Sequence, residues 1–397
     1  MRGIAENTQG LKVLIAGSVL QAFLGIIYVW SVFVMPVSEF YQWNPARVKL
    51  MTAYMLCAFV VGILIGGKFQ ERTGAAKAAL TGGMMFSAGT LATAFIPVKA
   101  AWLMYVSYGI IGGFGVGIAY NANISAAQKW FPRNRGFAAG VSVCAFGFST
   151  VIFAPLVESL ISRFGLQTTF ILLSAAFFAA VLALFSYIRF PESADKGAAP
   201  ALPPARMQYT TARMLARKEF YFITLSLMFA TATFFILNPS FKTLAAERGL
   251  DPEIGTAIVM MTGLANALGR LGIPLLSDAI GRESSALLII VITALCAVGL
   301  IFAQGFAFMA MIALIAFCYG GSSGVYPVLT ADYFGLKNIG SNYGAVMVGF
   351  AVSALVFPIL VSAVEDSTLK FAALAVLAVL GALLIMLLML AKRTFPT

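Results

Sequence analysis

Histidine is absent from this sequence of 397 residues, and charged residues make up only 10% of it. Without histidine no Ser–His–Asp triad can form, and a common side-chain ligand of zinc and haem is missing. No GxxxxGK[ST] phosphate-binding loop occurs, which argues against ATP-driven pumping. Because no nucleophile–base constellation appears either, we predict that the chain is not an enzyme and binds no cofactor.

Cysteine is also scarce. The four cysteines lie inside long apolar segments and lack the spacing of metal ligands. Free cysteine is among the most buried residue types, so we expect all four to be small packing residues. They are Cys57, Cys144, Cys296 and Cys318. No metal site is predicted.

Hydrophobic residues, by contrast, make up 61% of the chain. They gather in blocks of roughly 20 residues, the length of helix that crosses about 30 Å of hydrocarbon. The short alternating strands of a transmembrane barrel do not occur. We therefore predict an all-α membrane protein embedded in a lipid bilayer. Its twelve predicted spans cover residues 12–36, 48–67, 77–97, 101–126, 136–160, 167–189, 219–242, 253–276, 285–304, 307–331, 342–364 and 369–391.

One long polar break divides these spans six and six. Residues 191–217 are rich in Pro and Ala and too polar to lie in lipid. This segment predicts a cytoplasmic linker between an N-terminal six-helix bundle, residues 1–190, and a C-terminal six-helix bundle, residues 218–397. The first span is longer than a signal peptide and has no obvious cleavage site, so it is expected to be retained.

The positions of Lys and Arg indicate the orientation. With both termini inside, 18 of the 26 basic residues fall on cytoplasmic segments and seven on the opposite side. We therefore predict a multi-pass protein of the bacterial inner membrane with both termini cytoplasmic. The net charge of +11 is explained by the basic residues on these cytoplasmic segments, so it does not indicate nucleic-acid binding.

A short motif recurs after the second and the eighth span. The first copy, GGKFQERTGAAK, contains Glu71, Arg72 and Gly74, and the second, PLLSDAIGR, contains Asp278 and Arg282. In each, an acid ends a helix and a glycine that permits a tight turn follows three residues later. Acid and base can pair across the helix end in one conformational state, so we predict that these residues control gating.

With these motifs the whole chain resembles the major facilitator superfamily. Within it, the stretches YVWSVFVMPV, GVGIAYNANISAAQKWFPRNRG, NALGRLGIPLLSD and YFGLKNIGSNYG resemble the oxalate/formate antiporter family and the related monocarboxylate transporters. The resemblance implies two six-helix bundles that rock around a central site open to each side in turn. It also implies secondary transport of a small carboxylate, and we expect a monomer.

Arg270 is the formal charge that lies deepest in a predicted span. It precedes Asp278 by eight residues, which places it about 12 Å from the helix end. An arginine at such a depth costs at least about 2.5–3.5 kcal/mol on insertion scales. A substrate carboxylate would offset this cost by bidentate pairing with the guanidinium. The alternative is that Arg270 bonds to backbone carbonyls or extends toward the loop.

Polar residues at compatible depth complete the predicted substrate site. Asn266 lies one turn from Arg270 on the same helix face. In this superfamily the first, fourth, seventh and tenth spans line the cavity, which favours tyrosines on these spans. The further candidates are Tyr28, Tyr120, Asn121, Asn123, Tyr319 and Tyr326. Each is equally well explained as a contact between helices.

Two departures from the family pattern bear on the substrate. The oxalate transporter has a lysine shortly after NYG in the eleventh span, where this chain has Phe350. The tyrosine of the related family in the fifth span corresponds to Phe146. A single fixed positive charge suits one carboxylate, so we favour a monocarboxylate such as lactate, pyruvate or formate. An oxalate or dicarboxylate exchanger and an exporter of neutral or drug-like compounds remain the alternatives.

The coupling mode stays open at this level. Proton symport normally uses a titratable group in the pathway, and the spans hold neither His nor a mid-membrane Asp or Glu. Exchange of two anions at Arg270 needs no such group, whereas symport remains feasible if the proton travels with the carboxylic acid. A membrane-embedded sensor of carboxylates is a further alternative, which the short linker and the paired motifs disfavour.

Overall fold

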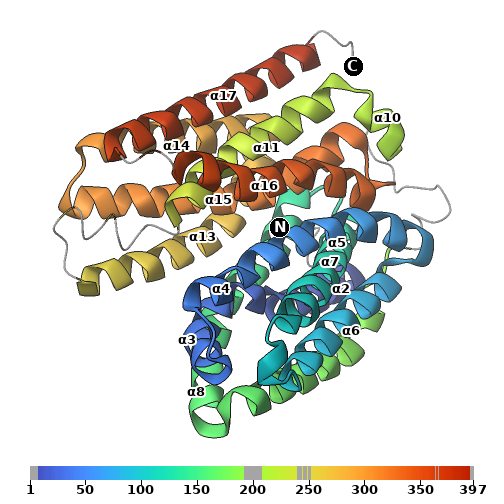
Figure 1. The fold of residues 1–397 in the computed structure, drawn as a ribbon. Helices are drawn as coiled ribbons and strands as arrows, with labels where there is room; N and C mark the ends of the chain where they lie inside the picture. Colours follow the sequence, from blue (N-terminus) through green and yellow to red (C-terminus); the bar gives the residue numbers. More distant parts are fainter. Residues whose placement is uncertain are drawn as a thin grey trace. The chain divides into compact units, whose positions relative to one another are not determined.

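The computed structural model describes residues 8–191, 208–238, 244, 248, 252–362, 364 and 366–393, and every regular element within them is a helix (Figure 1). The first half contains α2 (Thr8–Leu24), η1 (Gly25–Val29), α3 (Trp30–Tyr41), α4 (Pro45–Lys49), α5 (Met51–Thr73), α6 (Ala75–Ala94), η2 (Val98–Ala100), η3 (Tyr105–Gly112), α7 (Gly113–Trp130), α8 (Arg135–Leu184) and η4 (Phe185–Tyr187). The second contains α10 (Thr211–Leu215), α11 (Lys218–Leu237), α13 (Pro252–Ile280), α14 (Arg282–Phe302), α15 (Gly305–Phe334), α16 (Ile339–Ser362) and α17 (Ser367–Arg393). Residues 192–207 of the predicted linker lie outside the described residues.

These helices correspond to the predicted spans, with boundaries that differ by a few residues. Among the described residues, eight helical segments are long and apolar enough to cross a membrane by length and composition. One of them, Arg135–Tyr187, is continuous across the predicted boundary between the fifth and sixth spans. Gly165 breaks its helical geometry there with φ 78° and ψ 170°. The chain therefore turns at Gly165, and the two predicted spans are the two parts of α8.

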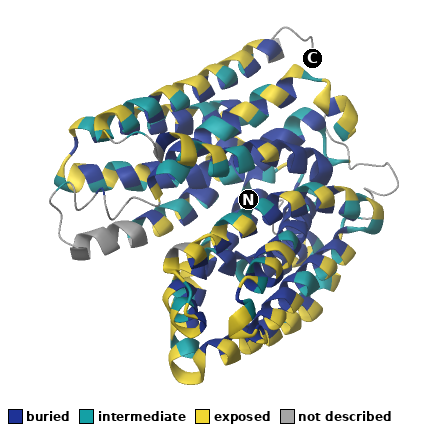
Figure 2. Ribbon diagram, viewed as in Figure 1, coloured by how far each residue is buried: buried dark blue, intermediate teal, exposed yellow. Residues whose placement is uncertain are grey.

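The outer faces of the helices carry the apolar side chains expected of a surface that contacts lipid. On α17, Val376 and Leu383 are 59% and 46% exposed, whereas Leu374 and Ile385 are completely buried. Figure 2 shows the same alternation of exposed and buried residues along the other long helices. A soluble protein rarely exposes such contiguous apolar surface.

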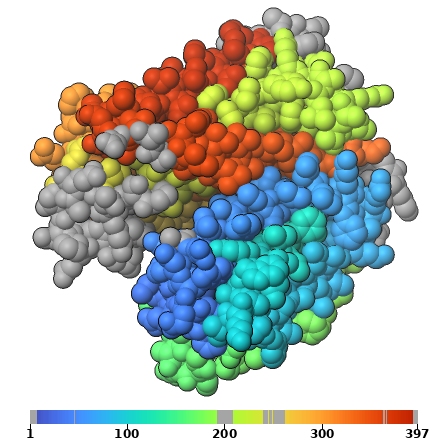
Figure 3. Space-filling model, viewed as in Figure 1, coloured from blue at the N-terminus to red at the C-terminus, as the bar shows by residue number. Residues whose placement is uncertain are grey.

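The chain divides into two compact units. Unit 1 consists of residues 1–138, 145–208 and 335–345, and unit 2 consists of residues 139–144, 209–334 and 346–397. Each unit thus contains one sequence half together with a short segment from the other half. In unit 2, α17 packs against α11 and α14 (Figure 3).

Candidate functional site

Arg270 lies on α13 in unit 2 and is almost completely buried, with 1% of its surface exposed. Its Nε donates a hydrogen bond to Oδ1 of Asn266, one helical turn earlier, at 3.0 Å. Its Nη1 donates to the backbone carbonyl of Val143, at 3.4 Å. Both of these partners are neutral, so neither cancels the positive charge.

The backbone around Arg270 is held by close helix contacts at glycines. A methyl group at Gly269 would collide with the carbonyl oxygen of Phe317 on α15. On the other side, a methyl group at Gly140 of α8 would lie 3.2 Å from the carbonyl oxygen of Arg270. Small residues thus allow α15 and the segment 139–144 to approach α13 closely and fix the position of Arg270.

The contact at Gly140 is one of a pair. The sequence N-x-G-x-x-x-G occurs at Asn134–Gly140 and again 204 residues later at Asn338–Gly344. In unit 1, a methyl group at Gly344 would lie 2.9 Å from the carbonyl oxygen of Ile63 on α5. Each unit therefore contains the same crossing, and Ile63 is the counterpart of Arg270.

Tyr319 belongs to an aromatic cluster of unit 2. Its ring stacks on that of Phe234, with centroids 4.0 Å apart and an interplanar angle of 10°. Phe235 meets Tyr319 and Phe350 edge-on at 5.4 and 5.0 Å. Phe350, the residue at the place of the family's lysine, is thus one wall of an apolar cluster.

Tyr326, also in unit 2, has no exposed surface. Its hydroxyl lies 3.1 Å from Oγ of Ser226 and donates a hydrogen bond to it. This bond joins α15 to α11. The geometry matches the contact between helices that the sequence left as the alternative.

Unit 1 contains a corresponding aromatic cluster around Phe146. The ring of Tyr28 meets Phe146 at 5.4 Å and that of Tyr120 meets it at 4.9 Å. Phe59 lies 5.2 Å from Tyr120. The two predicted tyrosines are therefore close together, next to the phenylalanine that replaces the tyrosine of the related family.

The two predicted asparagines of α7 differ sharply in their bonding. Asn121 is completely buried, and its Nδ2 donates to the carbonyl oxygens of Ile63 and Gly340, both at 2.8 Å. Asn123 is 1% exposed, and among the described residues neither its Nδ2 nor its Oδ1 has a hydrogen-bond partner. Asn121 joins three helices of unit 1, whereas Asn123 keeps its full hydrogen-bonding capacity.

The repeated acid–glycine motif forms a tight turn in both copies. Gly74 has φ 90° and Gly281 has φ 93°, backbone angles that residues other than glycine rarely adopt. Gly74 separates α5 from α6, and Gly281 separates α13 from α14. The turn predicted from the sequence is therefore present twice.

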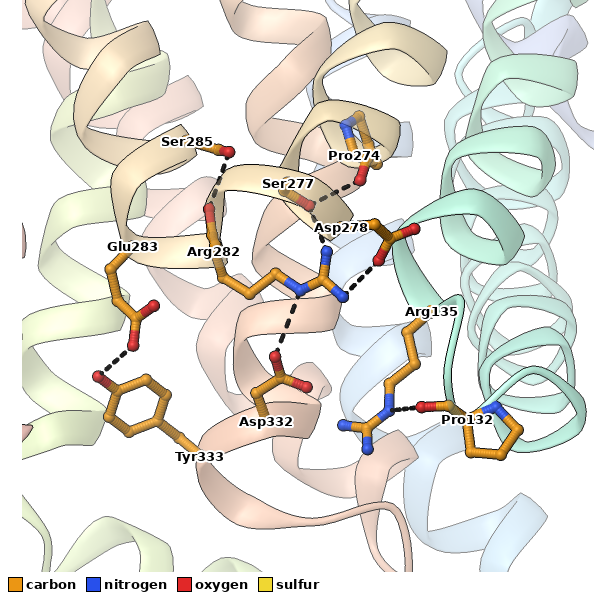
Figure 4. Close-up of polar contacts among 11 residues, drawn as sticks. Pro132, Arg135, Pro274, Ser277, Asp278, Arg282, Glu283, Ser285, Asp332 and Tyr333 are labelled. Carbon is orange, nitrogen blue, oxygen red and sulfur yellow. Dashed lines mark hydrogen bonds and ion pairs between the residues drawn. The ribbon is translucent and has the colours of Figure 1, made fainter. Parts of the chain in front are cut away.

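The second copy of the motif forms an ionic network within unit 2 (Figure 4). Arg282 donates from Nη2 to Asp278 at 2.5 Å and from Nη1 to Oγ of Ser277 at 2.6 Å. Its Nε donates to Asp332 at the end of α15, at 3.3 Å. Arg282 therefore links the last turn of α13 to the last turn of α15.

The first copy makes different contacts. Oε1 of Glu71 accepts a hydrogen bond from the backbone N–H of Ser341, at 3.0 Å. Arg72 is exposed, and no hydrogen bond or ion pair joins it to another residue in the described part of the chain. Glu71 thus contacts the first turn of α16, where free N–H groups favour a negative charge.

The sequence did not predict several of the groups that contact the candidate site residues. The carbonyls of Val143 and Gly340, together with Asp332, contact predicted site residues but were not themselves predicted. The repeated N-x-G-x-x-x-G pattern was the available signal, because two small residues four apart mark close helix contacts.

The chain matches the Major Facilitator Superfamily over residues 15–358, with a second match over residues 223–396. It belongs to this superfamily. The oxalate:formate antiporter of Oxalobacter formigenes is 26% identical over 331 residues, which cover 81% of this chain and 76% of the antiporter. Monocarboxylate transporter 13 of Rattus norvegicus is 24% identical over 353 residues, which cover 88% of this chain and 80% of that transporter. The solved structure of the major facilitator transporter FucP aligns with a TM-score of 0.72 at 13% identity, covering 97% of this chain and 99% of FucP.

Membership of the superfamily confirms several predictions. The chain is an all-α, multi-pass membrane protein with the twelve-helix major facilitator fold, and it is a transporter, not an enzyme. The predicted resemblance to the oxalate/formate antiporter family and the monocarboxylate transporters is confirmed by the relatives named above.

Proposed function

We propose that this superfamily member is a secondary transporter of a small monocarboxylate such as lactate, pyruvate or formate, and that Arg270 binds the carboxylate. The observation that carries the proposal is the burial of a guanidinium on a membrane helix, with 1% of Arg270 exposed. Asn266 and Val143 hold it through neutral groups.

The energetics favour an anionic ligand. A buried arginine costs at least about 2.5–3.5 kcal/mol on insertion scales, and the hydrogen bonds to Asn266 and Val143 do not neutralise its charge. A carboxylate accepts two parallel N–H bonds from a guanidinium and brings the compensating charge. A ligand of this kind therefore gains more from Arg270 than a neutral compound does.

The residues at the two positions where this chain departs from the family pattern favour one carboxylate over two. Phe350 is packed edge-on against Phe235 and supplies no second positive charge. Phe146 is likewise surrounded by the rings of Tyr28 and Tyr120. A dicarboxylate such as oxalate would bring a second negative charge that these apolar clusters do not neutralise.

The remaining features of the proposal concern the transport cycle. We propose a monomer of the bacterial inner membrane with both termini cytoplasmic, working by alternating access with proton symport or anion exchange. The proposed gating residues are Glu71, Arg72, Gly74, Asp278 and Arg282. The further proposed substrate contacts are Asn266, Tyr28, Tyr120, Asn121, Asn123, Tyr319 and Tyr326.

Uptake into proteoliposomes tests the proposal. Labelled lactate, pyruvate, formate and oxalate are supplied to the wild type, Arg270→Ala and Arg270→Lys. Arg213→Ala, at an exposed residue of α10, is the control. We expect a monocarboxylate to accumulate in the wild type and in the control. Both Arg270 variants are expected to lose at least about 90% of uptake, since lysine keeps the charge but not the bidentate geometry.

Each result has a definite meaning. Accumulation of oxalate in place of the monocarboxylates would overturn the argument from Phe350. Transport of none of the four anions, or normal uptake by both Arg270 variants, would overturn the carboxylate site and favour a neutral or drug-like substrate.

A further inference from the structure

Three basic residues from three separate elements lie at the end of unit 1 where α2 begins. Lys12 is exposed on the second turn of α2, and Lys129 lies in the last turn of α7. Arg189 follows η4 and is exposed. The transport site proposed above uses none of these residues, so their common location requires a separate explanation.

Contacts among α2, α7 and the end of η4 hold these cations beside one another. Nζ of Lys129 lies 3.5 Å from the centroid of the Phe190 ring. Nε1 of Trp130 donates a hydrogen bond to the carbonyl oxygen of Arg189 at 2.7 Å. With the amide of Gln9 oriented so that Oε1 faces Arg189, this oxygen accepts from Nε at 3.3 Å and from Nη2 at 2.6 Å.

The cluster keeps a positive charge. Gln9 is neutral, so its bonds orient the guanidinium of Arg189 without cancelling the charge, and they use only two of its five N–H donors. The acids Glu6 and Glu192 lie outside the described residues, and two acids would not cancel three bases. The segments that supply the three cations contain no Asp or Glu; they are 8–24, 113–130 and 167–191.

From this cluster, α2 and the second part of α8 run side by side through unit 1. Near the end of α2, the ring of Phe23 meets that of Phe177 edge-on, with centroids 6.0 Å apart. Near its start, α2 packs against η4 and Gln9 contacts Arg189. The two helices are therefore antiparallel neighbours over this length.

Both helices expose apolar side chains between these two contacts. On α2, Ile15 and Val19 are 56% and 41% exposed, and they lie three and seven residues after Lys12, on the same helix face. On α8, Phe178 and Leu182 are 42% and 45% exposed and lie one turn apart. The surface thus has cations at one end and two apolar rows that lead away from them.

We propose that this surface binds an anionic phospholipid, with its phosphate against Lys12, Lys129 and Arg189 and its acyl chains along the two apolar rows. Basic pockets between membrane helices bind anionic head groups, and a guanidinium matches the geometry of phosphate. The indole of Trp130 lies at the level of the cations, as is usual for tryptophan at a membrane interface. A zwitterionic lipid gains less, because its own cationic group is repelled by the cluster.

Native mass spectrometry of the full-length protein in detergent tests the proposal, with phosphatidylglycerol and phosphatidylcholine of identical acyl chains as the probes. The variant Lys12→Gln/Arg189→Gln is compared with the control Lys68→Gln/Arg213→Gln, which removes an exposed lysine of α5 and an exposed arginine of α10. We expect the wild type and the control to bind phosphatidylglycerol at least about tenfold more tightly than phosphatidylcholine. The Lys12→Gln/Arg189→Gln variant is expected to bind the two lipids equally.

Two outcomes would overturn the proposal. One is a preference for phosphatidylglycerol that survives in Lys12→Gln/Arg189→Gln, and the other is an equal loss of preference in the control. Displacement of the lipid by an equal concentration of inorganic phosphate would show that the apolar rows contribute nothing, and it also counts against the proposal. Arg189→Lys keeps the charge and is expected to keep most of the preference. No substrate is present, so the result is independent of the proposed carboxylate site.

Discussion

Nε of Arg270 donates to Oδ1 of Asn266 at 3.0 Å, one turn earlier on the same helix. This bond fixes the plane of the guanidinium and leaves its charge intact, because the partner is an amide. Asn266 is therefore expected to orient Arg270 in addition to its proposed contact with the anion. Its replacement separates the effect of orientation from the effect of charge.

Asn266→Asp is expected to reduce monocarboxylate uptake at least about tenfold at neutral pH. A carboxylate at this distance neutralises Arg270 and competes with the substrate anion. Uptake is expected to recover only at acidic pH, where the introduced carboxyl takes up a proton. Asn266→Leu serves as the control, with a raised KM and a pH profile like that of the wild type. An Asn266→Asp variant with wild-type uptake at neutral pH would contradict this role.

Phe350→Lys is expected to shift the preference from monocarboxylates toward oxalate. The substitution places a second positive charge in the aromatic cluster around Tyr319, and that charge pairs with a second carboxylate. The ratio of oxalate to lactate uptake is expected to rise at least about tenfold, a change of about 1.4 kcal/mol. Phe350→Met, which changes shape without charge, is the control. An unchanged ratio would show that residue 350 does not face the substrate.

Gly269→Ala is expected to destabilise the protein by about 1–3 kcal/mol, because the added methyl group collides with the carbonyl oxygen of Phe317. The control is Gly263→Ala on the same helix, where an added methyl group meets no atom within 4 Å. There the better helix propensity of alanine favours a small stabilisation. Thermal unfolding in detergent measures both. Equal melting temperatures would mean that α13 and α15 relax at little cost.

A double-mutant cycle on Arg282 and Asp278 is expected to give a coupling of roughly 0.5–1 kcal/mol, since the side chains are 12% and 18% exposed. Arg282→Gln, Asp278→Asn and the double variant are compared by thermal unfolding. A second cycle with Asp332, whose oxygen is 3.3 Å from Nε, is expected to give a smaller value. Zero coupling in both cycles would show that the network in Figure 4 adds no stability.

The sequence was sufficient to predict the membrane helices and their approximate limits, because apolar blocks long enough to cross a bilayer dominate the chain. The paired turns at Gly74 and Gly281 also followed from it, since a positive φ leaves a local requirement for glycine. The junction in α8 at Gly165 was placed between two spans, although the chain remains continuous there. Local patterns of this kind depend on neighbours in the sequence.

The hydrogen-bond partners of the buried polar groups could not be predicted from the sequence. The amide of Asn121 bonds to a carbonyl 219 residues away, and Nη1 of Arg270 bonds to one 127 residues away. Backbone carbonyls are identical at every residue, so the sequence carries no sign of which one a side chain will reach. The rotation of each helix decides this, and packing between helices sets that rotation.

The repeated crossing has a consequence for tolerance to substitution. A methyl group added at Gly140 would meet the backbone of α13, and one added at Gly344 would meet the backbone of α5. Both glycines are the last residue of the N-x-G-x-x-x-G motif. A complete map of tolerated substitutions should therefore show reduced tolerance at both glycines, 204 residues apart. The tolerance to substitution is expected to differ between the two copies at Arg270 and its counterpart Ile63. At Ile63 other apolar residues are expected to preserve transport, whereas at Arg270 no other residue is. The two halves therefore share the same helix packing, but only the second half supplies the charged residue of the proposed site.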